Sequence, residues 1–303
     1  MSTYTGRFAP TPSGPLHQGS LLTALASYLD AHANQGTWLL RMDDLDAPRN
    51  QAGAADKILF SLEQHGLYWD ASVLYQSSRL EAYRCALSQL VKAQQIFACR
   101  CSRKFLQGSR VYPGTCSRQI VSTENLDKLD GSVALRIKVG NNSLHFDDLI
   151  QGQFEGKLAD ETGDFIVFRK DSIYGYHLTT AVDDNFLKIS HIMRGADLLQ
   201  SSLQQTHLIN LLNLRLPLFG HIPVIVDDRG HKLSKHSQPA SIDETGPASN
   251  LCICLARLGQ NPPIELQYQT VNTVIQWGID NWNIDLIPGI RKFPYGTTSS
   301  SES

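Results

Sequence analysis

Residues 5–42 carry the pattern that most restricts how this chain can fold. Residues 5–10 predict a short buried strand that ends in a turn rich in Pro and Gly. Leu21, Leu25 and Leu29 then recur at helical spacing, and residues 38–42 predict a second buried strand. A strand, a glycine-containing turn, a helix and a strand form the start of a βαβ unit, which implies a parallel sheet. The sequence therefore predicts an α/β fold whose ligand site lies at the carboxyl ends of the strands.

The rest of the chain predicts one catalytic domain in two halves, with an insert between them. Residues 97–164 are turn-rich and contain three of the six cysteines, which predicts an inserted subdomain rather than a continuation of the sheet. Residues 1–96 and 165–240 are expected to form a Rossmann-type domain. Residues 241–290 predict a small helical end, and residues 291–303, which are rich in Ser and Thr, predict a disordered tail.

Composition excludes several classes of protein. The 27 Lys and Arg residues nearly balance the 29 Asp and Glu residues, which excludes a broad basic coat but not a local basic groove. No apolar run approaches the ~20 residues of a membrane-spanning helix, and the first residues lack the pattern of a signal peptide. Cysteines without an export signal favour thiols or metal ligands over disulfides. We therefore expect a cytoplasmic protein with no membrane partner. We also expect it to act as a monomer.

The turn after the first predicted strand contains a candidate phosphate site. His17, Gly19 and Ser20 lie where the following helix begins. Helix N-termini bind phosphate through free N–H groups and a partial positive charge. His17 can donate a hydrogen bond to a phosphate oxygen, and Gly19 allows close approach. Taken alone, a Pro-rich turn with an incidental histidine is the commoner explanation of so short a motif.

A second candidate phosphate site lies late in the chain. Lys232 and Lys235 flank Ser234 in a loop that follows a predicted strand. Two lysines three residues apart can both reach an α-phosphate as pyrophosphate leaves, and a donor placed where charge develops contributes roughly 3 kcal/mol in comparable sites. Taken alone, this pattern is more typical of a solvated basic loop.

Five motifs, taken in order, resemble the glutamyl branch of the class I aminoacyl-tRNA synthetases. They are RFAPTPSG at residues 7–14, LRMDDLD at 40–46, VDD at 182–184, MRGADL at 193–198 and KLSK at 232–235. The resemblance extends over about residues 6–240. It implies that ATP, together with Mg²⁺, is bound by His17, Gly19, Ser20, Lys232, Ser234 and Lys235. It also implies that His17, Lys232 and Lys235 are the catalytic residues, because they stabilise the transition state.

Glutamate presents two carboxylates and one ammonium, so its site needs both cationic and anionic contacts. Arg7 and Arg194 suit the carboxylates and Asp43 suits the ammonium, although each also suits an ordinary ion pair. The resemblance implies a glutamate pocket formed by Arg7, Phe8, Ala9, Pro10, Thr11, Asp43, Tyr176 and Arg194. Position 43 is often glutamate in the related enzymes, and Asp43 is one methylene shorter.

Three cysteines and a tyrosine form the pattern C-x-C-x10-Y-x3-C. Thiolates are strong zinc ligands and a structural zinc takes four ligands, but the residues alone are equally compatible with buried free thiols. No histidine lies in residues 97–143, and Tyr112 can serve as a phenolate only if a bound cation lowers its pKa. The resemblance implies one structural Zn²⁺ held by Cys99, Cys101, Tyr112 and Cys116. We assign the remaining cysteines to packing: Cys85, Cys252 and Cys254.

The segment after the lysine motif indicates the branch of the family. Glutamyl-tRNA synthetases carry a large anticodon-binding region there, whereas Lys235 lies 68 residues before the end of this sequence. The short end and the cysteine-bearing insert resemble the glutamyl-Q tRNA(Asp) synthetase family. This implies activation of L-glutamate by ATP without tRNA, and transfer of glutamate onto queuosine at the wobble position of tRNA(Asp). The alternatives are a truncated glutamyl-tRNA synthetase that charges a tRNA 3′ end, a non-catalytic glutamate- or RNA-binding paralogue, and glutamate transfer to a carrier.

Overall fold

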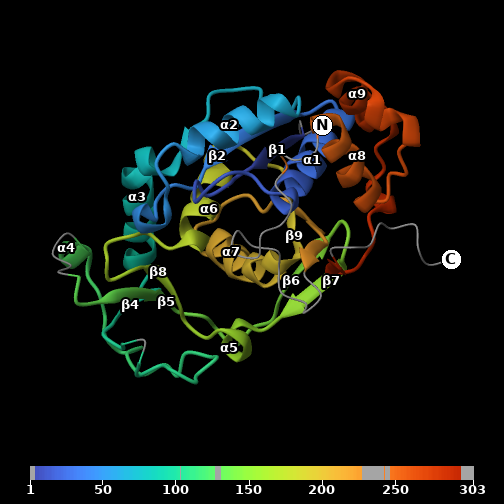
Figure 1. Ribbon diagram of the computed structural model, residues 1–303. Coiled ribbons are helices and arrows are strands. Elements are labelled where there is room, and N and C mark those ends of the chain that lie inside the picture. Colours follow the sequence, from blue (N-terminus) through green and yellow to red (C-terminus); the bar gives the residue numbers. More distant parts are fainter. Residues whose placement is uncertain (1–3, 103, 127–130, 227–241, 243–245, 295–303) are drawn as a thin grey trace.

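Helices and strands alternate along most of the chain, which confirms the predicted α/β class (Figure 1). The computed structural model describes residues 4–102, 104–126, 131–226, 242 and 246–294. The strands are β1 (Thr5–Phe8), β2 (Thr37–Met42), β3 (Leu74–Tyr75), β4 (Ile96–Cys99), β5 (Ala134–Ile137), β6 (Leu144–Asp148), β7 (Gly152–Gly156), β8 (Phe165–Phe168), β9 (His191–Gly195), β10 (Leu218–Ile222), β11 (Val224–Val226) and β12 (Lys292–Pro294). The α-helices are α1 (Gln18–Ala33), α2 (Ala54–Gln64), α3 (Leu80–Lys92), α4 (Thr123–Leu126), α5 (Leu158–Glu161), α6 (Tyr176–Phe186), α7 (Leu199–Leu211), α8 (Pro247–Arg257) and α9 (Val271–Asn281).

The strands that position the site form two parallel groups. β1 pairs with β2 and β2 with β3, all in parallel. β10 pairs in parallel with β9 and with β6. β9 lies beside β1, where the backbone N–H of Ser190 donates to the carbonyl oxygen of Thr5 at 2.9 Å. The chain leaves β1 toward β2 on one side and returns as β9 on the other, so a topological switch point lies between β1 and β9. Ligands of α/β proteins bind at such points.

Part of the predicted insert continues the sheet, so that expectation was wrong for residues 144–156. β6 pairs with β10 through Asp148 and Phe219, and β7 extends the sheet in the antiparallel direction. Only Phe146 and Asp148 of β6 are buried. An amphipathic strand of this kind has no apolar run, and its parallel partner β10 lies far away in the sequence. A separate antiparallel sheet joins β4, β5 and β8.

The C-terminal helices share a hydrophobic core with the first half of the chain. Buried side chains of α8 and α9 form one cluster with those of α1, β1 and β2, and Figure 1 shows α8 and α9 beside α1. Gly278 permits this approach, because a Cβ there would lie 3.0 Å from the nearest methyl carbon of Leu29. Trp282 Nε1 also donates to Asp30 Oδ1 at 2.9 Å. This helical end therefore braces the helix that carries the candidate phosphate site.

The predicted disordered tail contains a strand. Residues 292–294 form β12, which pairs in parallel with β11, and Phe293 is buried. This corrects the expectation for the start of segment 291–303, while residues 295–303 lie outside the described part. The pairing depends on a strand whose residues lie 68 positions earlier, which the composition of the tail does not reveal. Among the described residues, no helix combines the length and the apolar character needed to cross a bilayer.

Candidate active site and metal centre

A cavity of about 360 Å³ lies at the switch point between β1 and β9. Its walls come from the segment that follows β1, the first turn of α1, the end of β2 and the end of β9. Most of the predicted site residues line it: Arg7, Phe8, Ala9, Pro10, Thr11, His17, Gly19, Ser20, Asp43, Tyr176 and Arg194. Lys232, Ser234 and Lys235 lie outside the described residues.

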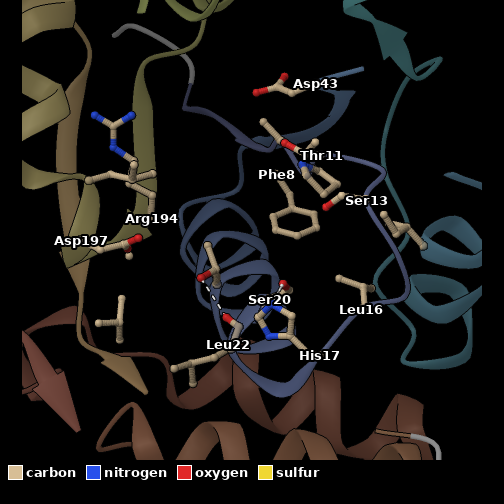
Figure 2. Close-up of a pocket in the computed structure, with 18 of the residues that line it drawn as sticks. Phe8, Thr11, Ser13, Leu16, His17, Ser20, Leu22, Asp43, Arg194 and Asp197 are labelled. Atoms are coloured by element: carbon tan, nitrogen blue, oxygen red, sulfur yellow. Dashed lines mark hydrogen bonds between the residues drawn. The ribbon is translucent and has the colours of Figure 1, made fainter. Parts of the chain in front are cut away.

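The cavity has two chemically different ends. Figure 2 shows the side chains of Arg194 and Asp43 toward one end, and those of His17 and Ser20 toward the other. The first end carries full charges, which suit the charged groups of an amino acid. The second end is the N-terminus of a helix of 16 residues, which suits a phosphate.

His17 is the N-cap of α1. Its backbone is extended, and its Nδ1 accepts a hydrogen bond from the backbone N–H of Ser20 at 3.3 Å. Its Nε2 lies 3.1 Å from the Ser20 hydroxyl. A Cβ at Gly19 would lie 3.3 Å from two atoms of the His17 imidazole. Glycine at this position thus leaves room for the imidazole to fold over the first turn, at the edge of the cavity.

A chain of buried ion pairs forms the floor of the charged end. Arg7 donates from Nε and Nη2 to the two carboxylate oxygens of Asp184, each at 3.1 Å. Arg41 donates from Nη1 to Asp184 at 2.7 Å and from Nε to Asp43 at 2.6 Å. Burial alone would raise the pKa of Asp184, but Arg7 and Arg41 hold it below its usual range. For Asp43 the burial outweighs the attraction of Arg41, and its pKa is raised.

Two members of this chain were not assigned a role from the sequence. Arg41 and Asp184 occur within the LRMDDLD and VDD motifs, so the motifs themselves were the signal. Two of the three guanidinium nitrogens of Arg7 donate to Asp184, and Arg41 donates to the carboxylate of Asp43. Arg7 therefore does not have two free nitrogens with which to bind a ligand carboxylate. Arg41 and Asp184 instead hold Arg7 and Asp43 in fixed positions at the cavity.

Arg194, on β9, has an incomplete set of partners. Its guanidinium is almost fully buried, and burial lowers its pKa. Nε donates to His221 Nε2 at 3.1 Å, and Nη2 donates to the hydroxyl of Ser202 at 2.6 Å. Nη1 is buried and has no hydrogen-bond partner among the described residues. A buried donor without an acceptor costs roughly 1–3 kcal/mol, and more when it is charged. Arg194 is also among the residues that line the cavity.

Three cysteines and Tyr112 converge beside β4, as a candidate metal centre. The sulfur atoms of Cys99, Cys101 and Cys116 all lie within 4.8 Å of one another. The Tyr112 hydroxyl lies 3.5 Å from the Cys99 sulfur and accepts a hydrogen bond from the backbone N–H of Cys116 at 2.9 Å. The guanidinium of Arg136 stacks over the Tyr112 ring at 3.9 Å. Burial opposes ionisation of Cys99, yet hydrogen bonds from Tyr112 and Arg136 lower its pKa to about 7.

This donor set suits a metal ion. Three thiols and one phenol supply four ligand atoms, the number that a structural zinc requires. Arg136 adds a positive charge that would offset part of their negative charge.

The three cysteines outside this cluster differ in burial. Cys252 and Cys254 are buried as expected, but Cys85 is exposed on α3, so its assignment to packing was wrong.

The family model for the catalytic domain of class I tRNA synthetases (E and Q) matches residues 4–263. Close relatives are named "Glutamyl-Q tRNA(Asp) synthetase". The protein of Ectopseudomonas mendocina is 43% identical over 293 residues, which cover 96% of this chain and 97% of the relative. That of Pseudomonas syringae pv. syringae is 45% identical over 289 residues, which cover 94% and 95%. The chain belongs to the glutamyl-Q tRNA(Asp) synthetase family.

Solved structures of the wider synthetase family share the fold. A glutamate-tRNA synthetase from Elizabethkingia anophelis aligns with a TM-score of 0.78 at 24% identity, over 96% of this chain and 68% of that protein. A glutamate tRNA ligase from Elizabethkingia meningosepticum, solved with its amino acid, gives the same TM-score at 23% identity. The glutamyl-Q tRNA(Asp) synthetase family is a ligase-type branch of the class I aminoacyl-tRNA synthetases, and this chain is such an enzyme. The region matched by the family model, residues 4–263, includes both the described lining of the cavity and the cysteine cluster.

Proposed function

We propose that this enzyme activates L-glutamate with ATP in the absence of tRNA, and that it then transfers glutamate onto queuosine at the wobble position of tRNA(Asp). The observation that carries this proposal is the buried Nη1 donor of Arg194, which lacks a partner among the described residues and belongs to a side chain that lines the cavity. A dicarboxylic amino acid supplies the missing anion. The names of the full-length relatives supply the nucleic-acid substrate.

The two ends of the cavity suggest how glutamate lies in it. The reacting α-carboxylate must reach the α-phosphate, which we place at the His17 end. The side-chain carboxylate then extends to the opposite end, where Arg194 lies (Figure 2). Asp43 accepts from the ammonium while it remains paired with Arg41, and Arg7 adds positive charge at the same end of the cavity as Asp43. Tyr176, partly exposed at the start of α6, contacts the bound amino acid from the side.

The first step needs no nucleophilic side chain. The α-carboxylate of glutamate attacks the α-phosphorus of ATP, a P–O bond forms, and the bond to pyrophosphate breaks. His17 and the first N–H groups of α1 stabilise the negative charge on the phosphates. Lys232 and Lys235, with Ser234, complete this contact in our proposal. Mg²⁺ bound with ATP would neutralise part of the phosphate charge.

In the second step, a hydroxyl of the cyclopentenediol ring of queuosine attacks the carbonyl carbon of the glutamyl-adenylate. An ester bond forms, AMP leaves with the bonding electron pair, and the proton of the hydroxyl passes to water. Since AMP is a good leaving group, the protein's main contribution is to hold the hydroxyl and the carbonyl together.

We also propose that Cys99, Cys101, Tyr112 and Cys116 hold one structural Zn²⁺. The support is the convergence of the three thiols and the phenol, and the stacked Arg136 beside them. Cys99 ends β4, whereas the other three ligands belong to the segment that follows it. The metal would therefore fasten residues 101–116 onto the sheet of β4, β5 and β8. Such a link replaces the large hydrophobic core that this short segment cannot form.

The experiment that tests the proposed function is charging with labelled glutamate and ATP on queuosine-containing tRNA(Asp), followed by nuclease mapping. We expect the label in the anticodon fragment. Label on the 3′-terminal adenosine would instead identify a truncated glutamyl-tRNA synthetase. Glutamate-dependent ATP–pyrophosphate exchange without tRNA tests the first step separately. Its absence, with folded protein, would favour the non-catalytic paralogue, and exchange without label in either tRNA fragment would favour a carrier as acceptor.

A further inference from the structure

His221, on β10, forms hydrogen bonds through both ring nitrogens in the interior of the protein. Its side chain is fully buried. Nδ1 contacts a carboxylate oxygen of Asp148, at the end of β6. Nε2 lies 3.1 Å from Arg194 Nε and 3.0 Å from the hydroxyl of Ser202, on α7. The imidazole thus connects three secondary-structure elements behind the guanidinium of Arg194.

Asp148 determines which ring nitrogen carries the proton. Burial opposes its ionisation, but His221 and backbone N–H groups hold the pKa of Asp148 below its usual range. Its Oδ1 accepts from the N–H groups of His221, Ile150 and Gln151 at 3.1, 3.1 and 2.9 Å. A carboxylate can only accept, so the proton of a neutral His221 lies on Nδ1 and Nε2 is left as an acceptor. That is the form which can receive the N–H of Arg194.

Two nitrogens of Arg194 are thereby fixed. Nε donates to His221 and Nη2 to Ser202, and the planar guanidinium then has only one orientation for Nη1. Nη1 is the buried donor that lacks a partner among the described residues. Since both partners of Arg194 are uncharged, they direct the guanidinium without neutralising it. Its positive charge stays available to a ligand.

We propose that His221 is a positioning residue: held as its Nδ1–H tautomer by Asp148, it orients Arg194 toward the substrate carboxylate and so determines the affinity for glutamate. This inference rests on the proposed contact between Arg194 and glutamate. It assigns a role to a part of the molecule that lies behind the cavity, since neither His221 nor Asp148 is among the residues that line it.

The arrangement makes glutamate affinity dependent on pH. Protonated His221 would turn its Nε2 into a donor that faces the donor Nε of Arg194. The charged groups that act on His221 are Asp148 on β6, Arg194 on β9 and Asp197 after β9; the rings of Phe146 and Phe219 cover it. Burial lowers the pKa of His221, and Asp148 only partly opposes this. We therefore expect full affinity at neutral pH and a rise in KM for glutamate only on the acidic side of 6.5.

Two substitutions separate positioning from simple packing. In His221→Gln, the side-chain amide oxygen can occupy the position of Nε2 and accept from Arg194, but it does not titrate. In His221→Asn, the shorter amide lies near the position of Nδ1, so it can contact Asp148 but does not reach Arg194. ATP–pyrophosphate exchange would be measured from pH 5 to pH 8 at varied glutamate and at varied ATP, together with the melting temperature of each variant.

We expect His221→Asn to raise KM for glutamate by about tenfold or more, with a much smaller change in KM for ATP. We expect His221→Gln to retain most of the glutamate affinity and to lose the acid-side rise in KM. If both variants raise KM for glutamate equally and lower the melting temperature equally, His221 has a packing role and the inference is overturned. The inference is also overturned if Arg194→Gln raises KM for glutamate but His221→Asn leaves it unchanged. If Arg194→Gln itself leaves KM unchanged, the proposed glutamate contact fails, and the positioning role fails with it.

Discussion

Replacing Arg194 by Gln tests the proposed contact between Arg194 and glutamate. Arg194 is almost fully buried, and Nη1 is the donor that lacks a partner among the described residues. Gln keeps a polar end but is uncharged and shorter. The two hydrogen-bonded partners of Arg194 are neutral. The substitution therefore removes a positive charge without leaving a buried carboxylate among those partners unpaired. The effect should therefore fall on the ligand rather than on the fold.

The size of the effect follows from the environment. Two unit charges about 4 Å apart attract by ~4 kcal/mol at the effective dielectric constant of a partly buried site. A hydrogen bond to a charged group contributes about 1.5–3 kcal/mol, and these two figures describe the same contact rather than separate ones. Taking about 3 kcal/mol for the loss, and 1.4 kcal/mol for each factor of ten, we expect KM for glutamate to rise about 100-fold.

The assay is glutamate-dependent ATP–pyrophosphate exchange, measured at saturating ATP and then at saturating glutamate. We expect KM for ATP to change by less than about threefold, because Arg194 lies toward the end of the cavity opposite His17 and Ser20 (Figure 2). Arg84→Gln is the matched control: it makes the same chemical change at an exposed side chain on α3 that pairs with Glu81, and it should leave both KM values unaltered. A folded Arg194→Gln protein whose KM for glutamate stays within twofold of the wild type would refute the reasoning.

Three further predictions test other parts of the molecule. Lys235→Ala should slow adenylate formation by about 100-fold without lowering the melting temperature, and near-normal pyrophosphate exchange would remove Lys235 from the mechanism. Cys116→Ser should lower the zinc content of the purified protein, whereas unchanged stoichiometric metal would show that the ligand set is wrong. Burial, with the nearby charge of Arg194, lowers the pKa of His177 from 6.5 to about 4, so stability should be full above pH 6.5 and decline as the pH falls toward 4. His177→Gln should flatten that part of a plot of melting temperature against pH, and an unchanged slope would assign it to other groups.

Elements defined by local patterns could be predicted from the sequence. The βαβ opening was recognised because a helix and its flanking strands each carry their own periodicity within a few tens of residues. The resemblance to the family implied the cysteine–tyrosine cluster, whose first and last members, Cys99 and Cys116, are only 17 positions apart. The five motifs indicated the family in the same way. In each case the residues that matter are near neighbours along the chain.

Strands β6 and β7 show what sequence patterns miss. β6 buries only alternate residues, and its place in the sheet depends on β10, which lies about 70 residues later. β12 likewise depends on β11. The pairings of β6 with β10 and of β12 with β11 join strands that are far apart in the sequence, and no local periodicity records either partner.

The sequence by itself determined the α/β class, the family and the residue types that meet at the cavity. Only the tertiary structure decided how those charges are paired. Arg7 and Asp184 are 177 positions apart, and their contact means that two guanidinium nitrogens of Arg7 already donate to a carboxylate of the protein. His221 and Asp148 are 73 positions apart, and their contact sets the proton on the imidazole that faces Arg194. An isolated arginine in a sequence is simply a cation. Folding brings together elements from distant parts of the chain. These elements determine the partners of the arginine, its burial and which of its nitrogens can still donate to a ligand.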